Sequence, residues 1–367
     1  MVSDALLEVG YRWLDRGLIP DFILRRVIRA LLRQRLREID QGSLEANHAA
    51  KMKWIEDVRS RVHIAELTEK ANEQHYEVST KFILSTLGPC AKYSSCFYPT
   101  GKETLAEAEV LMLESYCKKA QMKDGQDVLD LGCGWGSLSL FLAQKYPKSR
   151  ITGLSNSTTQ KAHIDATAKS RGLTNLEIIT ADVNAHDFAG SKYFDRILSI
   201  EMFEHMKNYE VLLAKVSTWL RPREKAVDVD EALLFVHIFC HRTTPYHFEV
   251  DDGWMAQNFF SGGTMPSHDL LLYFQSDLTL VRSWYIPGTH YSRTLEDWLK
   301  LQGSNSKAEL KELREDAKLK GRTAAEGTAT FHKFRVFYMA CSELFNMDRG
   351  QQWGVGHYLF KAKEQPL

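Results

Sequence analysis

Short apolar runs alternate with segments of helical periodicity between residues 126 and 240. Val128, Leu129 and Leu131 form the first run, which is typical of a buried strand. Similar runs follow at 150–154, 176–180, 195–200 and 233–239, with helices predicted over 137–145, 160–169 and 209–220. Because strands that alternate with helices form parallel sheets covered on both faces, this pattern predicts a doubly wound, Rossmann-like α/β fold.

The first quarter of the chain is predicted to be helical. Within residues 22–37, arginines crowd the faces beside an apolar stripe, which consists of Leu24, Val27, Ile28, Leu31 and Leu32. Such a basic amphipathic helix suits either an anionic membrane surface or packing on the main domain, and we favour packing as the simpler interpretation. Further helical segments over 49–87 end at Gly88 and Pro89, which break helices.

Beyond residue 240 the chain changes to aromatic-rich pieces of weak periodicity. A charged helix is predicted over 305–322 and an aromatic helix over 331–345. The chain is therefore divided into an N-terminal helical extension (1–92), a ligand-binding core (93–240), and a substrate lid with closing strands of the core (241–367). The charged segment 221–231 is a long connection without a functional interpretation.

The composition of the chain limits the kinds of binding partner that we expect. The 47 Lys and Arg residues balance 47 Asp and Glu residues, so no overall field attracts nucleic acid. The six cysteines contain no Cys-x-x-Cys pair and the N-terminus does not resemble a secretory signal, so we expect free thiols and a cytoplasmic location. No apolar run reaches the roughly 18 residues of a spanning helix, so stable membrane insertion is not expected. The oligomeric state stays open, a homodimer included.

The turn Gly132-Cys133-Gly134-Trp135-Gly136 after the first strand is the main candidate for a ligand site. Its glycines leave space beside a helix N-terminus, where N–H groups favour an anionic or carbonyl-rich ligand. Glycines alone do not choose between a nicotinamide cofactor, a flavin and S-adenosylmethionine. Dinucleotide folds usually place an acid after the second strand, but residues 153–160 contain none. Asp182 and Val183, after the third strand, suit the amine and ring of a purine instead.

Three motifs give the chain a family resemblance. The glycine turn, the group Ser155-Asn156 with Gln160, and residues 202–206 (MFEHM) resemble S-adenosylmethionine-dependent methyltransferases of the cyclopropane-fatty-acyl-phospholipid synthase family. Residues 201–210 (EMFEHMKNYE) look closest to the plant coclaurine N-methyltransferases of benzylisoquinoline alkaloid synthesis. The resemblance covers nearly the whole chain, and it implies a class I methyltransferase sheet.

The resemblance also implies a site for S-adenosyl-L-methionine. Tyr93 and Ser94 would hold its methionine end, and the glycines would allow close approach. Asn156 and Gln160 would take the ribose, while Ile200 would lie under the ligand. The implied cofactor set is Tyr93, Ser94, Asp130, Gly132, Gly134, Asn156, Gln160, Asp182, Val183 and Ile200.

An acceptor amine requires a base, because an alkylamine is mostly protonated at neutral pH and has no lone pair for attack. Glu201, Glu204 and His205 follow the fourth strand, and their spacing places all three on one face if a helix has begun there. We assign Glu204 as the carboxylate partner of the substrate cation and His205 as proton acceptor, although these two roles could be exchanged. The plainer alternative is that the glutamates complement a helix N-terminus and the histidine belongs to the core.

Other residues allow competing interpretations. His237 and His241 would lie roughly 13 Å apart on one strand, too far for a shared metal ion. Cys341 matches a cysteine that the family has been suspected of using as a nucleophile, but a buried thiol on an apolar helix is usually inert. The substrate candidates are Tyr76, His237, Phe260, Tyr291 and Phe334.

Lipid cyclopropanation is the alternative function. In cyclopropane synthases a bicarbonate is held by residues that match Cys133, Glu204, His237 and Tyr291 here. Tyr291 stands where the coclaurine enzymes tend to have phenylalanine, which favours this alternative. Phe334 stands where the alkaloid enzymes have tryptophan, so coclaurine itself is a doubtful substrate. A non-enzymatic binding protein is disfavoured because the acidic cluster is intact.

Overall fold

A computed structural model describes residues 4–64, 78–225, 231–248, 254–259 and 263–363. These residues form a seven-stranded sheet with the order β3-β2-β1-β4-β5-β9-β8 and a separate two-stranded sheet. The large sheet consists of β1 (Asp127–Leu131), β2 (Arg150–Ser155), β3 (Leu176–Thr180), β4 (Arg196–Ile200), β5 (Leu233–His241), β8 (Leu278–Pro287) and β9 (Trp353–Ala362). The small sheet pairs β6 (Tyr246–His247) with β7 (Thr264–Met265).

The predicted α/β fold is confirmed for β1 to β5, which all run parallel to one another. The sheet as a whole is mixed, because β9 runs antiparallel between β5 and β8. The third segment of the chain therefore supplies two strands to the sheet of the second segment.

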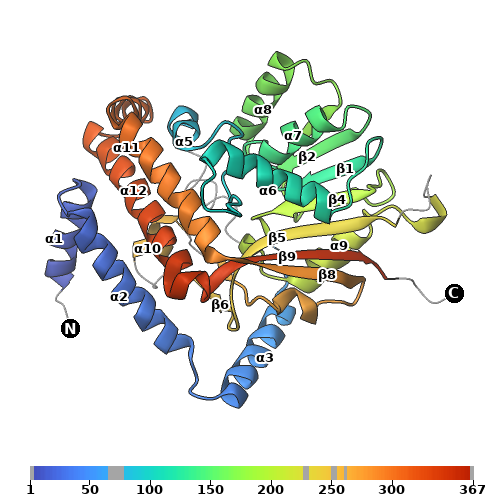
Figure 1. Cartoon of the computed structure of the whole chain (residues 1–367), viewed down its shortest axis with the longest axis horizontal. Coiled ribbons are helices and arrows are strands. Elements are labelled where there is room, and N and C mark those ends of the chain that lie inside the picture. The colour runs from blue at the N-terminus through green and yellow to red at the C-terminus, as the bar shows by residue number, and fades with distance from the viewer. Residues whose placement is uncertain (1–3, 65–77, 226–230, 249–253, 260–262, 364–367) are drawn as a thin grey trace.

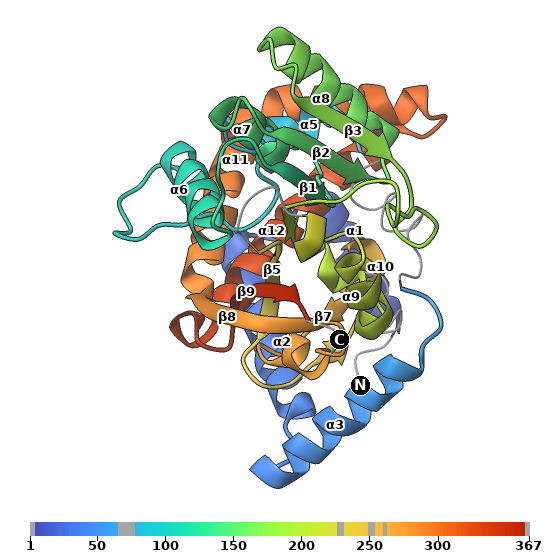
Figure 2. The same ribbon diagram turned by 90° about the vertical axis from the view of Figure 1, so that its right-hand side faces the viewer.

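Alternate residues of the central strands enter two cores. Val128 joins the cluster that contains Met112 and Leu113 of α6 (Leu105–Lys119), whereas Leu129 joins the cluster that contains Leu212 of α9 (Tyr209–Ser217). Figure 2 shows α6 and α9 on opposite sides of the sheet. The remaining helices of the α/β core are α7 (Ser137–Lys145) and α8 (Thr158–Ser170).

A long helical hairpin stands beside the sheet and consists of α11 (Gly288–Leu319) and α12 (Ala324–Asn346). The predicted helices at 305–322 and 331–345 are too short. Tyr291, Leu295 and Trp298 are buried at helical spacing, so α11 begins well before its charged half. The short helix α10 (Trp254–Phe259) contacts α12.

The described part of the N-terminal extension is helical. Its helices are α1 (Asp4–Asp15), α2 (Asp21–Ile39), α3 (Leu44–Ser60) and α5 (Thr80–Thr86). Helices α1, α2 and α5 pack on the hairpin of α11 and α12, whereas α3 contacts α9 (Figure 1). Leu24, Ile28 and Leu32 of α2 pack against the core, whereas Val27 and Leu31 are exposed.

Ion pairs fix α2 in this position. Arg25 Nη1 lies 2.7 Å from Glu296 Oε1, and Arg29 Nε lies 2.5 Å from Glu343 Oε2. These contacts agree with the packing interpretation of the basic helix. Within the described ranges, no helix combines the length and apolar character needed to cross a membrane.

Substitutions of two glycines test how closely α11 and α12 approach each other in the hairpin. At Gly327, a Cβ would lie 2.4 Å from the carbonyl oxygen of Leu313, whereas at Gly303 it would meet nothing within 4 Å. Gly327→Ala should therefore destabilise the protein by about 1–3 kcal/mol through overpacking of α12 on α11. Gly303→Ala should stabilise it by about 0.5–1 kcal/mol, because alanine is the better helix former. Equal unfolding midpoints of the two variants in urea would contradict this close approach.

Candidate active site

The glycine turn after β1 forms the floor of a pocket at the carboxyl edge of the sheet. Gly132 (φ 87°), Gly134 (φ 52°) and Gly136 (φ 82°) adopt left-handed backbone conformations that favour glycine. The N–H groups of Gly132 and Cys133 both donate to the carbonyl oxygen of Leu154, which ties the turn to β2. A Cβ at Gly134 would meet no atom within 4 Å, so open space lies over the turn.

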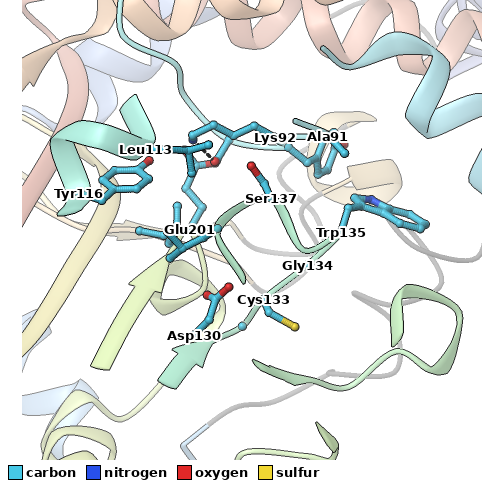
Figure 3. Close-up of a pocket in the computed structure, with 15 residues that line it drawn as sticks. Ala91, Lys92, Leu113, Tyr116, Asp130, Cys133, Gly134, Trp135, Ser137 and Glu201 are labelled. Atoms are coloured by element: carbon cyan, nitrogen blue, oxygen red, sulfur yellow. Dashed lines mark hydrogen bonds between the residues drawn. The ribbon is translucent and has the colours of Figure 1, made fainter. Parts of the chain in front are cut away.

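The pocket encloses about 520 Å³ including its mouth, and it is built from five parts of the fold. Residues 91–94, α6, the end of β1 with the glycine turn, the start of α7 and the end of β4 each contribute to its wall (Figure 3). Six of the predicted cofactor residues line it, namely Tyr93, Ser94, Asp130, Gly132, Gly134 and Ile200.

The other four predicted cofactor residues follow β2 and β3, the strands next to β1, and do not line this pocket. Gln160 is buried and accepts from Ser155 Oγ at 2.8 Å, but its Nε2 has no partner among the described residues. Asp182 Oδ1 accepts from the backbone N–H of Asn184 at 2.8 Å. Asn156 is exposed and Val183 is buried.

Two buried ionisable side chains, Asp130 and Lys92, line the pocket. Asp130 Oδ2 accepts from Ser139 Oγ at 2.6 Å, and burial raises the pKa of Asp130 to about 7. Lys92, which the sequence analysis did not select, is 1% exposed and donates to Ser94 Oγ at 2.5 Å and to the carbonyl oxygen of Ser95 at 2.7 Å. Burial lowers the pKa of Lys92. A lysine in a polar loop carries no local signal of burial, so only the structure reveals it.

Glu201 is held by three donors at the end of β4. Its Oε1 accepts from the backbone N–H of Ser95 at 2.9 Å and from His237 Nε2 at 3.0 Å, and its Oε2 accepts from the Tyr291 hydroxyl at 2.5 Å. Burial raises the pKa of Glu201, while Lys92 and the bond from Tyr291 oppose that rise. The predicted substrate residues His237 and Tyr291 therefore converge on one carboxylate.

Glu204 is buried in a different way. Neither of its carboxylate oxygens makes a normal hydrogen bond to a described residue, although it is 1% exposed. Burial and then the charge of Glu201 raise the pKa of Glu204 well above its usual range. An unpaired polar group of this kind costs about 1–3 kcal/mol, so the site is incomplete without a partner for this acid.

A helix has not yet begun at these acids, so the condition for a shared helical face is not met. Glu201 has a left-handed φ of 48°, and only a short 3-10 turn over Phe203–His205 precedes α9, which begins at Tyr209. Glu201, Glu204 and His205 therefore do not share a helical face. They nevertheless remain near one another, since the charge of Glu201 interacts with both His205 and Glu204.

The remaining predicted residues fall outside this acidic pair. Phe334 lies in an aromatic cluster, 5.1 Å from the Phe82 ring and 5.2 Å from the Phe259 ring. Burial, and then the charge of Glu201, raise the pKa of Cys341 to about 12, so its side chain is a thiol at neutral pH and a poor nucleophile. Tyr76 and Phe260 lie outside the described residues. Among the described residues, no group of His, Cys, Asp and Glu is arranged to hold a metal ion.

Known proteins share this fold and nearly its full length. The profile of the mycolic acid cyclopropane synthetase family matches residues 64–351. The (S)-coclaurine N-methyltransferase of Thalictrum flavum subsp. glaucum is 38% identical over 98% of this chain and 97% of its own, and that of Papaver somniferum is 37% identical over 96% and 97%.

A crystal structure of coclaurine N-methyltransferase bound to N-methylheliamine and SAH superposes with a TM-score of 0.89, at 37% identity over 97% of this chain and 99% of that one. The open glycine turn, the 38% identity over 98% of the chain and this superposition together show the family of the chain. The chain belongs to the mycolic acid cyclopropane synthetase family, within its coclaurine N-methyltransferase branch, and is an S-adenosylmethionine-dependent methyltransferase.

Proposed function

We propose that the protein transfers a methyl group from S-adenosyl-L-methionine to the nitrogen of a small aromatic or arylalkyl amine, by direct in-line displacement. The single observation that carries this proposal is Glu204, a buried acid with unpaired oxygens that follows the pocket residue Glu201 by three positions. A cationic amine is the ligand that would satisfy such a group. The coclaurine and N-methylheliamine named for the relatives belong to the same class of amine.

The residues of the pocket suit the cofactor. Ser137 is the first residue of α7 and lines the pocket. Its Oγ has no partner among the described residues, so it is available to a polar ligand at this helix N-terminus. Asp130 and Glu201 supply negative charge toward a cationic ligand, and Gly134 leaves room for it. When bound, the cofactor supplies an activated methyl group on a positive sulfur.

The arrangement around Glu201 favours amine methylation over cyclopropanation. His237 and Tyr291, which match residues that hold bicarbonate in cyclopropane synthases, both donate to the carboxylate of Glu201. A carboxylate is planar and anionic like bicarbonate, so the chain already supplies the anion that these donors bind. Glu204, the acid of the matched set, is left for another ligand.

The two acids and His205 divide the work on the amine. Binding of a cation next to Glu204 lowers the pKa of this acid again, so the site becomes ionised when the substrate arrives. We assign Glu204 to the ammonium group and His205 to removal of its proton. The aromatic cluster around Phe334 offers rings against which an arylalkyl group packs.

The first test supplies the protein with labelled S-adenosylmethionine and, in separate reactions, a panel of amines or unsaturated phospholipid vesicles. We expect label on the nitrogen of an arylalkyl amine and none in the lipid, because Glu201 occupies the bicarbonate donors. Label recovered as a cyclopropane ring, with every amine unmodified, would refute the proposal.

The second test separates the two catalytic residues. Glu204→Gln keeps the size of the side chain but removes its charge, so KM for the amine should rise about 10- to 100-fold, the equivalent of about 1.5–3 kcal/mol for a charged hydrogen bond. His205→Ala should lower kcat more than it raises KM. The control is Glu210→Gln, since Glu210 lies on α9 and contacts Ser276. An unchanged KM in Glu204→Gln would exclude Glu204 as the partner of the cation.

The third test concerns the adenine site. Asp182→Ala should weaken S-adenosylhomocysteine binding by about 1–3 kcal/mol, because the exocyclic amine would lose its acceptor. Asn184→Ala is the matched control, since it removes the 3.0 Å contact of Asn184 Nδ2 with Asp182 Oδ1 but keeps the carboxylate. Isothermal titration calorimetry measures both, and equal affinities for the Asp182 variant and the unaltered protein would place the adenine elsewhere.

A further inference from the structure

A continuous chain of hydrogen bonds leads away from Glu201 through the sheet. His237 Nε2 lies 3.0 Å from Glu201 Oε1, and His237 Nδ1 lies 2.9 Å from His357 Nε2. His357 Nδ1 lies 2.6 Å from Lys119 Nζ. The chain thus joins the acid of the active site to a lysine at the end of α6 through two imidazole rings.

The register of the sheet builds this chain. Ile200, which precedes Glu201, pairs with His237 on β5, and His237 pairs directly with His357 on β9. Residues directly opposite each other in an antiparallel pair project to the same face, so the two rings lie side by side with centroids 4.8 Å apart. Lys119 reaches the rings from α6, which covers this face.

Both histidines are fully buried, so their protonation states depend on burial and on their hydrogen-bond partners. Burial lowers the pKa of His237 and of His357 well below the usual range, so each ring is neutral and offers one donor and one acceptor. One consistent assignment has Lys119 donating to His357, His357 to His237, and His237 to Glu201. The opposite assignment, in which every bond is reversed, requires Lys119 to be neutral and Glu201 to be protonated.

Lys119 stands at the outer end of the chain, where its side chain is partly exposed. It contacts the His357 ring on β9. Its Nζ also lies 5.1 Å from the centre of the Trp284 ring on β8, and the guanidinium of Arg282 lies over the same ring. Burial lowers the pKa of Lys119 to about 8, so this amine exchanges its proton with solvent near neutral pH.

We propose that the chain Glu201–His237–His357–Lys119 carries the proton released by amine methylation out of the closed active site. The proposal rests on the proposed function, because methylation of a protonated amine by a sulfonium yields a methylated ammonium ion, a thioether and one proton. Lys119 and His357 are then positioning residues that act through Glu201.

The transfer balances along the chain. The transfer starts from the reversed assignment, in which Lys119 is neutral and both rings carry their proton on Nδ1. A proton taken from the nitrogen by His205 passes to Glu201, which then gives it to the unprotonated His237 Nε2. His237 releases its Nδ1 proton to His357 Nε2, and His357 releases its Nδ1 proton to the neutral amine of Lys119. Lys119 becomes an ammonium group and returns the proton to solvent. The two rings return to their first tautomers between turnovers, and Tyr116, whose hydroxyl lies 2.9 Å from His237 Nδ1, is an alternative partner during that return.

The test compares Lys119→Met with Lys118→Met. Both variants remove one positive charge from the end of α6, but Lys118 is exposed while Lys119 contacts His357. With a secondary amine, Lys119→Met should lower kcat about tenfold at unchanged KM, a modest share of what acid–base catalysis contributes. Lys118→Met should behave as the unaltered protein.

The pH profile and buffer dependence report the proton path directly. In the unaltered protein kcat should rise through about pH 8 as Lys119 becomes neutral and accepts the outgoing proton, and this rise should vanish in Lys119→Met. Increasing phosphate at constant pH and ionic strength should restore kcat of Lys119→Met but leave the unaltered enzyme unchanged. A Lys119→Met kcat within twofold of the unaltered enzyme, or a loss that phosphate does not relieve, would overturn the proposal.

A tertiary amine provides the matched substrate. Assayed above its own pKa, it carries no N–H bond and releases no proton, so Lys119→Met should leave its methylation within twofold of normal. An equal tenfold loss for secondary and tertiary amines would mean that Lys119 acts only on structure, and would also overturn the proposal.

A measurement without turnover separates failure of this inference from failure of the proposed function. In ¹⁵N spectra of histidine-labelled protein, His237 and His357 should change tautomer together as pH passes about 8, and should lose this change in Lys119→Met. If no amine is methylated but the tautomers change together, the proposed function fails while the chain stands. If amines are methylated and the tautomers do not respond, the chain fails alone.

Discussion

The burial of two carboxylates at the end of β4 is the constraint on which this active site depends. Burial raises the pKa of both Glu201 and Glu204, and the charge of Glu201 raises the pKa of Glu204 further. The fold compensates only one of them, since Glu201 has three donors whereas Glu204 has unpaired oxygens. The site is therefore electrostatically incomplete in a way that a cationic ligand corrects, and the proximity of a bound methyl donor then turns binding into catalysis.

The mixed sheet makes this arrangement rigid. Parallel strands β1 and β4 bring the glycine turn and Glu201 to one edge, as in other doubly wound sheets. The antiparallel strand β9 adds His357 directly beside His237, and the hairpin of α11 and α12 brings in Tyr291 from the opposite direction. The N-terminal helix α2 secures that hairpin through Glu296 and Glu343. Segments from every part of the chain thus determine the position of one carboxylate.

The same arrangement explains how related sequences can support different chemistry. The donors His237 and Tyr291 suit any planar anion, whether it comes from solution or from the chain. In this protein Glu201 provides that anion, so the donors no longer distinguish the two reactions, and the unpaired acid becomes the informative residue. Matching residue types one by one therefore did not separate amine methylation from lipid cyclopropanation, whereas the hydrogen-bond partners of Glu201 and Glu204 favour amine methylation.

The sequence by itself determined the parallel core and the glycine turn, because these depend on local apolar runs and on backbone conformations that only glycine adopts readily. It determined the cofactor through the absence of an acid in residues 153–160 and through motifs that resemble a known family. It also located the acids, but it left open whether they share a helical face, and the left-handed backbone at Glu201 excludes that arrangement. Only the tertiary structure decided which acid is paired, that Lys92 is buried, and that His357 and Lys119 join Glu201. Those contacts join residues that lie between 36 and 238 positions apart or, for Lys92, depend on burial by distant segments. Their electrostatics follow from strand register and desolvation, which no local pattern encodes.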